Sequence, residues 1–370
     1  MKIARLGLIA LTLMAALSAA GREHAYGPWN IDASAALKFE TNNNVFYDET
    51  GAVSDTAWHI NPKLGFEYEQ LGNTLFLAEL DLDSSFHSKY DEANITQTIM
   101  RIEARPVRSG GYAIFGMNYE MRLNYAPDGG LLRTAINEIK LGGGFAGLHL
   151  DTGVNFVLER GSYSPGAYSQ FNYGRSGLEG EIRYRVNSLY WIGGLGFGSL
   201  NYADNLMSDG RYTTLTGGVG KEITPKTKVE FRANIYSETH AEGDGFSGLL
   251  FGFKAVHASY SGKGELTVGI DREVVPSTVA GVNFGQVTSV HFASKNELSQ
   301  QFSSTFGLKF QSAGFDTRSD RTFELGFEGV YLFRQNAGVT FGFRNASRTS
   351  SEETYSFRQF SLFCGVKAVY

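Results

Sequence analysis

Apolar residues recur at every second position in many short segments of this chain. The first segment contains Ile31, Ala33 and Ala35, each followed by a polar or small residue. A period of two residues places alternate side chains on opposite faces of an extended strand. The same alternation occurs in residues 58–68, 76–86, 113–123, 148–158, 178–186, 229–235, 266–270, 302–310, 323–333 and 339–343. No helical period competes with it, so the chain is predicted to be all-β.

The two faces of these segments differ in charge. In residues 76–86 the apolar face has no charged side chain, whereas the other face has Glu79, Asp81 and Asp83. This contrast fits a strand with lipid on one side and water on the other. A sheet can cross a membrane only when it closes, because closure pairs every backbone donor and acceptor. We therefore predict a transmembrane antiparallel up-and-down β-barrel.

The connections between the segments are alternately short and longer. About eight short turns, one of them expected at Gly142–Ala146, and about nine longer loops, the longest at 42–57, separate the segments. They predict about 18 strands, with about 16 as the alternative. An even number puts both termini on the side of the short turns, which is the periplasmic side in bacterial barrels.

Residues 1–20 have the three parts of a secretory signal peptide. Lys2 and Arg5 precede an apolar run over residues 6–17, and Ser18 to Ala20 are small. The run is too short to span about 30 Å of hydrocarbon as a helix, which favours a cleaved signal over a membrane anchor. The predicted parts are a signal peptide at 1–20 and an outer-membrane β-barrel at 21–370.

The last segment alternates up to the final residue of the sequence. Its apolar face consists of Phe360, Leu362, Cys364, Val366, Ala368 and Tyr370. An aromatic residue at a strand end fits the girdle that such barrels place at the membrane interface. We predict that the last segment is the closing strand. The expected signal for the barrel-assembly machinery consists of Phe360, Leu362, Val366 and Tyr370.

Composition and charge agree with this class. The chain has 45 Gly, 28 Phe and 19 Tyr but only seven Pro, and its hydrophobic residues are dispersed among polar ones. A net charge of −5 gives no basic patch for nucleic acid. The expected location is the outer membrane of a Gram-negative bacterium, with its lipid as the surrounding partner. A barrel of this size leaves an aqueous lumen.

Alternation places thirteen charged side chains in that lumen, acids mixed with bases. They are Glu79, Asp81, Asp83, Arg101, Glu103, Glu179, Glu181, Arg183, Arg185, Glu230, Arg232, Glu324 and Glu328. A mixed lining favours polar, hydroxyl-rich or weakly charged solutes over ions of one sign. The arginines are the stronger candidates for binding, because guanidinium groups hold carboxylates by two hydrogen bonds. The plainer alternative is that these residues only solvate the lumen and pair across strands.

Aromatic residues near the predicted strand ends are expected to anchor the barrel at the membrane interface, among them Trp58, Tyr173, Trp191 and Tyr202. Stacking against carbohydrate is the alternative for inward-facing rings, and Tyr112 and Tyr236 are the candidates. The sequence has no Gly-x-Ser-x-Gly or His-Glu-x-x-His motif and no Cys/His cluster. We therefore predict no enzyme activity, no cofactor and no metal site.

The N-terminal quarter of the barrel resembles a known family. The quoted segments, in order, are Thr41-Asn-Asn-Asn-Val-Phe-Tyr47, Val53-Ser-Asp55, Asn61-Pro-Lys-Leu64, Phe66-Glu-Tyr-Glu-Gln-Leu-Gly-Asn73 and Phe86-His-Ser-Lys-Tyr90. They resemble the opening of the β-barrel porin 2 family of outer-membrane barrels. The resemblance implies a link to exopolysaccharide production, with saccharide and periplasmic polysaccharide-export components as partners.

Three functions are compatible with these observations. The chain could be a channel that passes saccharide or polysaccharide, with export of exopolysaccharide favoured by the resemblance alone. It could instead be a general or nutrient-uptake porin. A structural or adhesive barrel with a closed lumen is the third, and an inward-folded loop at residues 42–57 would be one way to close it.

Overall fold

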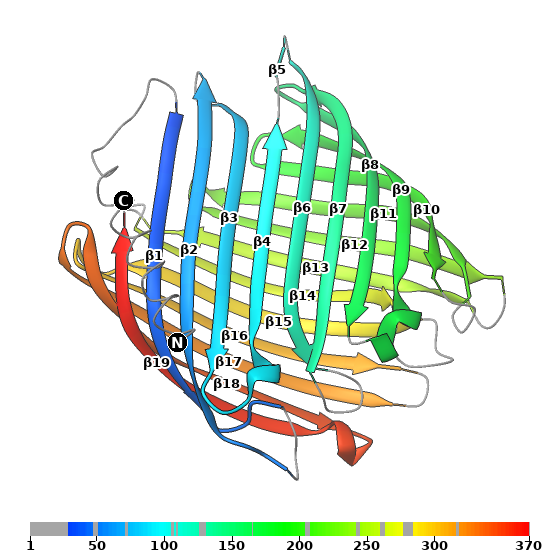
Figure 1. The fold of residues 1–370 in the computed structure, drawn as a ribbon. Coiled ribbons are helices and arrows are strands. Elements are labelled where there is room, and N and C mark those ends of the chain that lie inside the picture. The colour runs from blue at the N-terminus through cyan, green and yellow to red at the C-terminus, as the bar shows by residue number, and fades with distance from the viewer. Residues whose placement is uncertain are drawn as a thin grey trace.

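One antiparallel sheet closes on itself in the computed structural model of the chain (Figure 1). The structure describes residues 29–369, except for 47–50, 71–72, 105–106, 109, 126–130, 165, 204–207, 242–244, 260–262, 277–283 and 316–317. The expected signal peptide at 1–20 and the terminal Tyr370 therefore lie outside the described residues. Within the described ranges, none of the helices has the length and apolar character needed to cross a bilayer.

Nineteen strands and three short 3-10 helices make up the described chain. The strands are β1 (Trp29–Asn42), β2 (Asp55–Gln70), β3 (Asn73–His87), β4 (Ile95–Ala104), β5 (Val107–Arg108), β6 (Gly111–Tyr125), β7 (Leu131–Ala146), β8 (Leu150–Ser164), β9 (Tyr173–Val186), β10 (Leu189–Tyr202), β11 (Gly210–Thr224), β12 (Thr227–His240), β13 (Phe246–Ala258), β14 (Gly264–Pro276), β15 (Phe284–Glu297), β16 (Phe302–Gly314), β17 (Ser319–Arg334), β18 (Ala337–Ser350) and β19 (Phe357–Val369). The helices are η1 (Asp91–Ala93), η2 (Gly166–Phe171) and η3 (Glu353–Tyr355).

The sheet forms an up-and-down barrel of 18 strand positions. Each strand pairs with its neighbour in sequence, and β1 also pairs with β19. The two-residue β5 and the longer β4 both pair with β6, so they share one position in the wall. The predicted fold class and the count of 18 are confirmed. In Figure 1 the front wall, from β1 to β9, runs across the strands behind it, as expected for strands tilted in a barrel.

The two ends of the barrel differ in their connections. One end has the short turns, such as 187–188 and 335–336, together with the start of β1 and the end of β19. The other end has the longer connections and all three 3-10 helices. Because short turns face the periplasm in bacterial barrels, we refer to these as the periplasmic end and the outer end.

Apolar side chains cover the outside of the wall. Leu195 of β10 is paired directly with Leu215 of β11, and each side chain is 54% exposed. Trp58 and Trp191, expected at the membrane interface, also point outward and are exposed. In a water-soluble sheet such residues would be buried in a core; here they form the face that contacts lipid.

The predicted turn at Gly142–Ala146 is wrong, because these residues belong to β7 and the turn lies at 147–149. A run of glycines usually indicates a turn. Here the glycines allow close packing within the wall. A Cβ atom on Gly144 would lie 2.7 Å from the hydroxyl of Tyr112, and one on Gly142 would lie 2.5 Å from the carbonyl oxygen of Val154. Glycine is needed at these positions because neighbouring atoms occupy the space that a side chain would fill.

The closing seam joins the first and last strands, which lie side by side in Figure 1. Nine residue pairs connect them, from Ser34–Val369 to Asn42–Ser361. The loop after β1 extends the contact, since the Asn43 backbone donates to the Phe360 carbonyl at 3.1 Å. The described members of the predicted assembly signal, Phe360, Leu362 and Val366, are exposed on the outer face of β19.

Candidate functional site

All thirteen charged residues expected in the lumen lie on the inner face. Ten of them line three cavities inside the barrel: Asp81, Asp83, Arg101, Glu103, Glu179, Glu181, Arg183, Arg232, Glu324 and Glu328. The other three contact residues of that lining. Glu79 pairs with Arg101 at 4.0 Å, Arg185 pairs with Asp151 at 3.6 Å, and Glu230 pairs with Arg232 at 2.5 Å. Their role in transport stays a prediction.

Four of these side chains form a network of ion pairs along the inner face of the wall, between β9 and β12. We call this network the ion-pair bridge. Arg232 of β12 donates to Glu181 of β9 at 2.8 Å and to Glu230 at 2.5 Å. Arg183 donates to Glu181 at 2.6 Å and lies 3.9 Å from Glu230. The hydroxyl of Tyr190 donates to Glu230 at 2.9 Å. Each acid thus contacts two guanidinium groups, and the four members have no net charge.

Glycines on the strands between allow this bridge to form. Strands β10 and β11 separate β9 from β12, a distance of about 14 Å along the wall for three strand spacings. A Cβ atom on Gly218 would lie 2.7 Å from the backbone oxygen of Phe231 and 3.4 Å from Cγ of Arg232. The ring of Tyr190 lies over Gly220 in the same way. Side chains from β9 and β12 can therefore reach one another over the inner face of β10 and β11, where few side chains stand between them.

The other side of the lumen, near the closing seam, has separate pairs. Lys38 of β1 contacts Glu328 of β17 at 3.2 Å, and the Thr340 hydroxyl donates to the same carboxylate at 3.1 Å. Lys63 pairs with Asp81. The ring of His59 lies between two carboxylates, with Nδ1 at 2.9 Å from Asp83 and Nε2 at 3.3 Å from Glu40.

Two of the aromatic residues expected at the membrane interface point inward instead. Tyr173 is 6% exposed, its ring lies over Gly161, and its hydroxyl donates to Glu159 at 2.6 Å. Tyr202 packs against the cluster formed by Leu132 and the 3-10 helix η2. The prediction for both is wrong, because position near a strand end does not decide which face a side chain occupies. Strand register decides this, and here it turns both rings toward the lumen at the outer end.

The two tyrosines considered for carbohydrate stacking both face inward. Tyr236 stacks against Tyr212 with ring centroids 6.1 Å apart, and its hydroxyl donates to Glu238 at 2.6 Å. Tyr112 lines the cavity at the periplasmic end and donates to the backbone oxygen of Thr152 at 3.2 Å. These contacts order both rings within the wall, while any carbohydrate binding stays a prediction.

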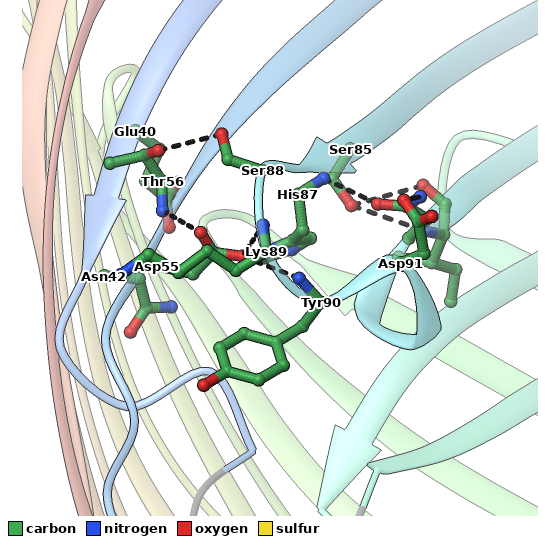
Figure 2. Close-up of polar contacts among 12 residues, drawn as sticks. Glu40, Asn42, Asp55, Thr56, Ser85, His87, Ser88, Lys89, Tyr90 and Asp91 are labelled. Carbon is green, nitrogen blue, oxygen red and sulfur yellow. Dashed lines mark hydrogen bonds and ion pairs between the residues drawn. The ribbon is translucent and has the colours of Figure 1, made fainter. Parts of the chain in front are cut away.

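At the outer end, Asp55 joins the first two outer loops (Figure 2). Its side chain is fully buried and accepts backbone hydrogen bonds from Thr56 at 2.7 Å, Lys89 at 3.1 Å and Tyr90 at 3.2 Å. Nδ1 of His87 lies 3.5 Å away. Two of the segments that carried the family resemblance, 53–55 and 86–90, are therefore in direct contact. Their function here is to hold the loop after β3 against β2.

Replacing Asp55 by Ala should destabilise this end of the barrel. The substitution removes the acceptor of three backbone N–H groups, and an unpaired buried donor costs about 1–3 kcal/mol. We expect folded protein to convert to its heat-denatured form on a gel at a temperature several degrees below wild type. Three unpaired donors cost several kcal/mol together, and each kcal/mol lowers the melting temperature of a chain this long by about 1–2 °C. Asp55→Asn, which keeps one acceptor oxygen, should fall between the two. An Asp55→Ala melting profile identical to wild type would contradict this role.

Three of the cavities in the lumen are lined by described charged residues. The largest of the three, about 1180 Å³, lies over β2 to β12 toward the periplasmic end. The other two, of about 500 and 660 Å³, lie beside the closing seam and share Asp83 and Arg344. No group of three or more His, Cys, Asp or Glu side chains in the described part of the chain could hold a metal ion.

Several charged lumen residues were missed by the sequence analysis. Lys38, Lys140 and Lys367 all line a cavity. Each follows the alternation, since Lys38 lies between Leu37 and Phe39. The signal was present, but attention to strands with several charges left out those with a single lysine.

Comparison with known proteins finds structural likeness without a matching family. No protein-family model and no curated protein matches the chain. Among solved structures, Pseudomonas aeruginosa OccK2 (OpdF) has 10% identity and a TM-score of 0.46 over 92% of this chain and 98% of that one. OpdK of the same species, solved with vanillate, has 12% identity and a TM-score of 0.45 over 92% and 99%. The siderophore receptor PirA has 7% identity and a TM-score of 0.45 over 92% and 80%.

None of these structures assigns a function to this chain. The location follows from the physical argument. A closed barrel with an even number of strands and an apolar exterior is the form of bacterial outer-membrane proteins. The chain is accordingly an outer-membrane barrel of a Gram-negative bacterium.

Proposed function

We propose that this chain is an outer-membrane porin, a water-filled channel that passes small polar solutes by diffusion. The supporting observation is that charged side chains lie on the inner face of the wall and large apolar side chains on its outer face. Charged side chains, among them ten of those predicted for the lumen, line cavities of about 500 to 1180 Å³, while leucine, phenylalanine and tryptophan face outward. Charged groups stay ionised at low cost only where water reaches them. A hydrated lumen that runs along a membrane-spanning wall is what a channel requires.

We favour general or nutrient uptake over export of exopolysaccharide as the function of this channel. Export rested on the family resemblance, and no family model matches the chain. The polar lining of the lumen supports passage of small hydrated solutes, because paired acids and bases replace part of the hydration shell without binding one sign tightly.

Conductance in planar bilayers tests the proposal. Refolded protein whose gel mobility changes on heating should give discrete current steps, and liposomes containing it should swell faster in monosaccharide than in trisaccharide solutions. Heat-denatured protein at the same concentration is the control. Folded protein that gives neither current nor swelling would overturn the proposal in favour of a structural barrel with a closed lumen.

A further inference from the structure

One cavity of the lumen has more positive than negative side chains. We call it the seam basin: the cavity of about 660 Å³ beside the closing seam, lined by residues of β1 to β4 and β15 to β19. Its cationic residues are Lys38, Lys63, Lys295, Arg344 and Lys367, and its anionic residues are Asp81, Asp83 and Glu328. The excess is unexpected in a chain whose net charge is −5.

The three carboxylates of the seam basin already have partners. Asp81 pairs with Lys63, and Asp83 accepts from the ring of His59 at 2.9 Å. Glu328 is held by Lys38 at 3.2 Å and by a threonine hydroxyl. Lys295 and Lys367 take part in none of these contacts, whereas Arg344 adds to the electrostatic stabilisation of Asp83 and of the neighbouring Glu40.

Two of the remaining cations lack an ion-pair partner among the described side chains. Neither Lys295 nor Lys367 has a described carboxylate within ion-pair distance. Lys367 is attracted by the charge of Glu328 and repelled by those of Lys63, Lys38 and Lys295. The guanidinium of Arg344 lies over the ring of Phe363 at 5.5 Å from its centroid, and Lys38 lies over the same ring at 4.9 Å. Phe363 is 5% exposed, so it forms a fixed platform that keeps two positive groups together.

The largest cavity, on the other side of the lumen, has the opposite balance. It is lined by the cations Arg101, Lys140, Arg183 and Arg232 and by the anions Glu67, Glu103, Asp151, Glu179 and Glu181. Most of these belong to the ion-pair bridge or to the pair of Arg101 with Glu103 at 2.7 Å. The cavity of about 500 Å³ is lined by Lys309 and Arg344 and by Glu40, Asp83 and Glu324. Among the three cavities described, the excess of lysine and arginine therefore lies in the seam basin.

We propose that the seam basin binds small oxyanions, carrying a carboxylate or phosphate group, and gives the channel a preference for anions. This inference rests on the proposed porin function and names the solute class that the lumen selects. Like charges held together by a low-dielectric wall repel one another, and an anion that enters between them removes that repulsion. The ammonium groups supply point charges, and the Arg344 fork can hold two oxygens of one anion.

Reversal potentials in planar bilayers with a potassium chloride gradient test the proposal. Wild-type channels should favour chloride over potassium. The double variant Lys295→Gln/Lys367→Gln should lower that permeability ratio by about threefold or more, since each removed charge contributes a Coulomb energy of order RT near the path. Inorganic phosphate at millimolar concentration should reduce the chloride current of wild type more than that of the double variant.

Two further variants locate the effect. Lys221→Gln removes the same charge from an exposed position on β11, opposite Leu189 and Val229 on the outer face, and should leave the permeability ratio unchanged. Lys140→Gln removes a lumen cation from the largest cavity and should reduce the ratio less than Lys367→Gln does.

The outcomes separate the two proposals. Folded wild-type protein without any current would overturn the porin function itself. A conducting wild type that prefers potassium, a double variant with the wild-type ratio, or a Lys140→Gln effect equal to that of Lys367→Gln would overturn the anion site and leave the porin in place.

Discussion

Replacing Leu215 by Arg should strongly reduce the fraction of this protein that folds into lipid. Leu215 lies in the middle of β11, is 54% exposed on the outer face and is paired with the equally exposed Leu195. A guanidinium there would face hydrocarbon. For the lipid face of a barrel this costs about 2–4 kcal/mol at the bilayer midplane. Urea titration of protein folded into phospholipid vesicles measures the change.

The adjacent position provides the matched control. Thr214 lines the largest cavity, so Thr214→Arg places the same group on the same strand but toward the lumen. We expect its unfolding free energy to stay within about 1 kcal/mol of wild type, because water can hydrate the charge. Equal destabilisation by both substitutions would contradict the assignment of the two faces to lipid and water.

Replacing Gly365 by Val should prevent closure of the barrel. Gly365 lies on the inner face of β19, opposite Lys38 of β1 and Thr340 of β18. A Cβ atom there would overlap the backbone oxygen of Leu37 and lie 2.7 Å from Cα of Lys38. The obstacle is backbone, which cannot rotate away as a side chain can. Overpacking of this kind costs about 1–3 kcal/mol, and it acts on a ladder of nine residue pairs.

We expect Gly365→Val to yield mostly protein that does not show heat-dependent gel mobility after refolding. Cys364→Val is the matched control, since Cys364 is exposed on the outer face of the same strand. That variant should refold like wild type, because valine is well suited to a strand facing lipid. Normal folding of Gly365→Val would show that the seam between β1 and β19 is looser than its geometry indicates.

For the lumen residues, the alternation of apolar and polar positions predicted correctly which face of the wall each side chain occupies. Position on a strand of period two fixes which face a side chain occupies, so Glu181, Arg183 and Arg232 could be assigned to the lumen from the sequence. The ion-pair partners of these residues could not be assigned from the sequence. Glu181 and Arg232 are 51 residues apart, and two strands lie between theirs. Their contact depends on the shear of the barrel and on glycines that leave the inner face of the two intervening strands without bulky side chains.

Glycine and aromatic residues show where sequence reasoning fails. Gly142 and its neighbours indicate a turn by composition, yet they lie within β7 because Tyr112 and the next strand occupy the space of their side chains. Tyr173 and Tyr202 look like interface anchors, yet strand register turns them toward the lumen, where they pack at the outer end. In each case the deciding contact is with a residue on another strand.

By itself, the sequence indicated the all-β class, the closed up-and-down topology, a count of about 18 strands and the inner face for the thirteen charged residues named from it. These follow from a local period of two and from the difference between lipid and water as solvents for the two faces. Only the tertiary structure decided which charges neutralise one another, and so which cavity keeps a positive excess. That balance depends on closure, which places β1 to β4 beside β15 to β19 although they lie at opposite ends of the chain.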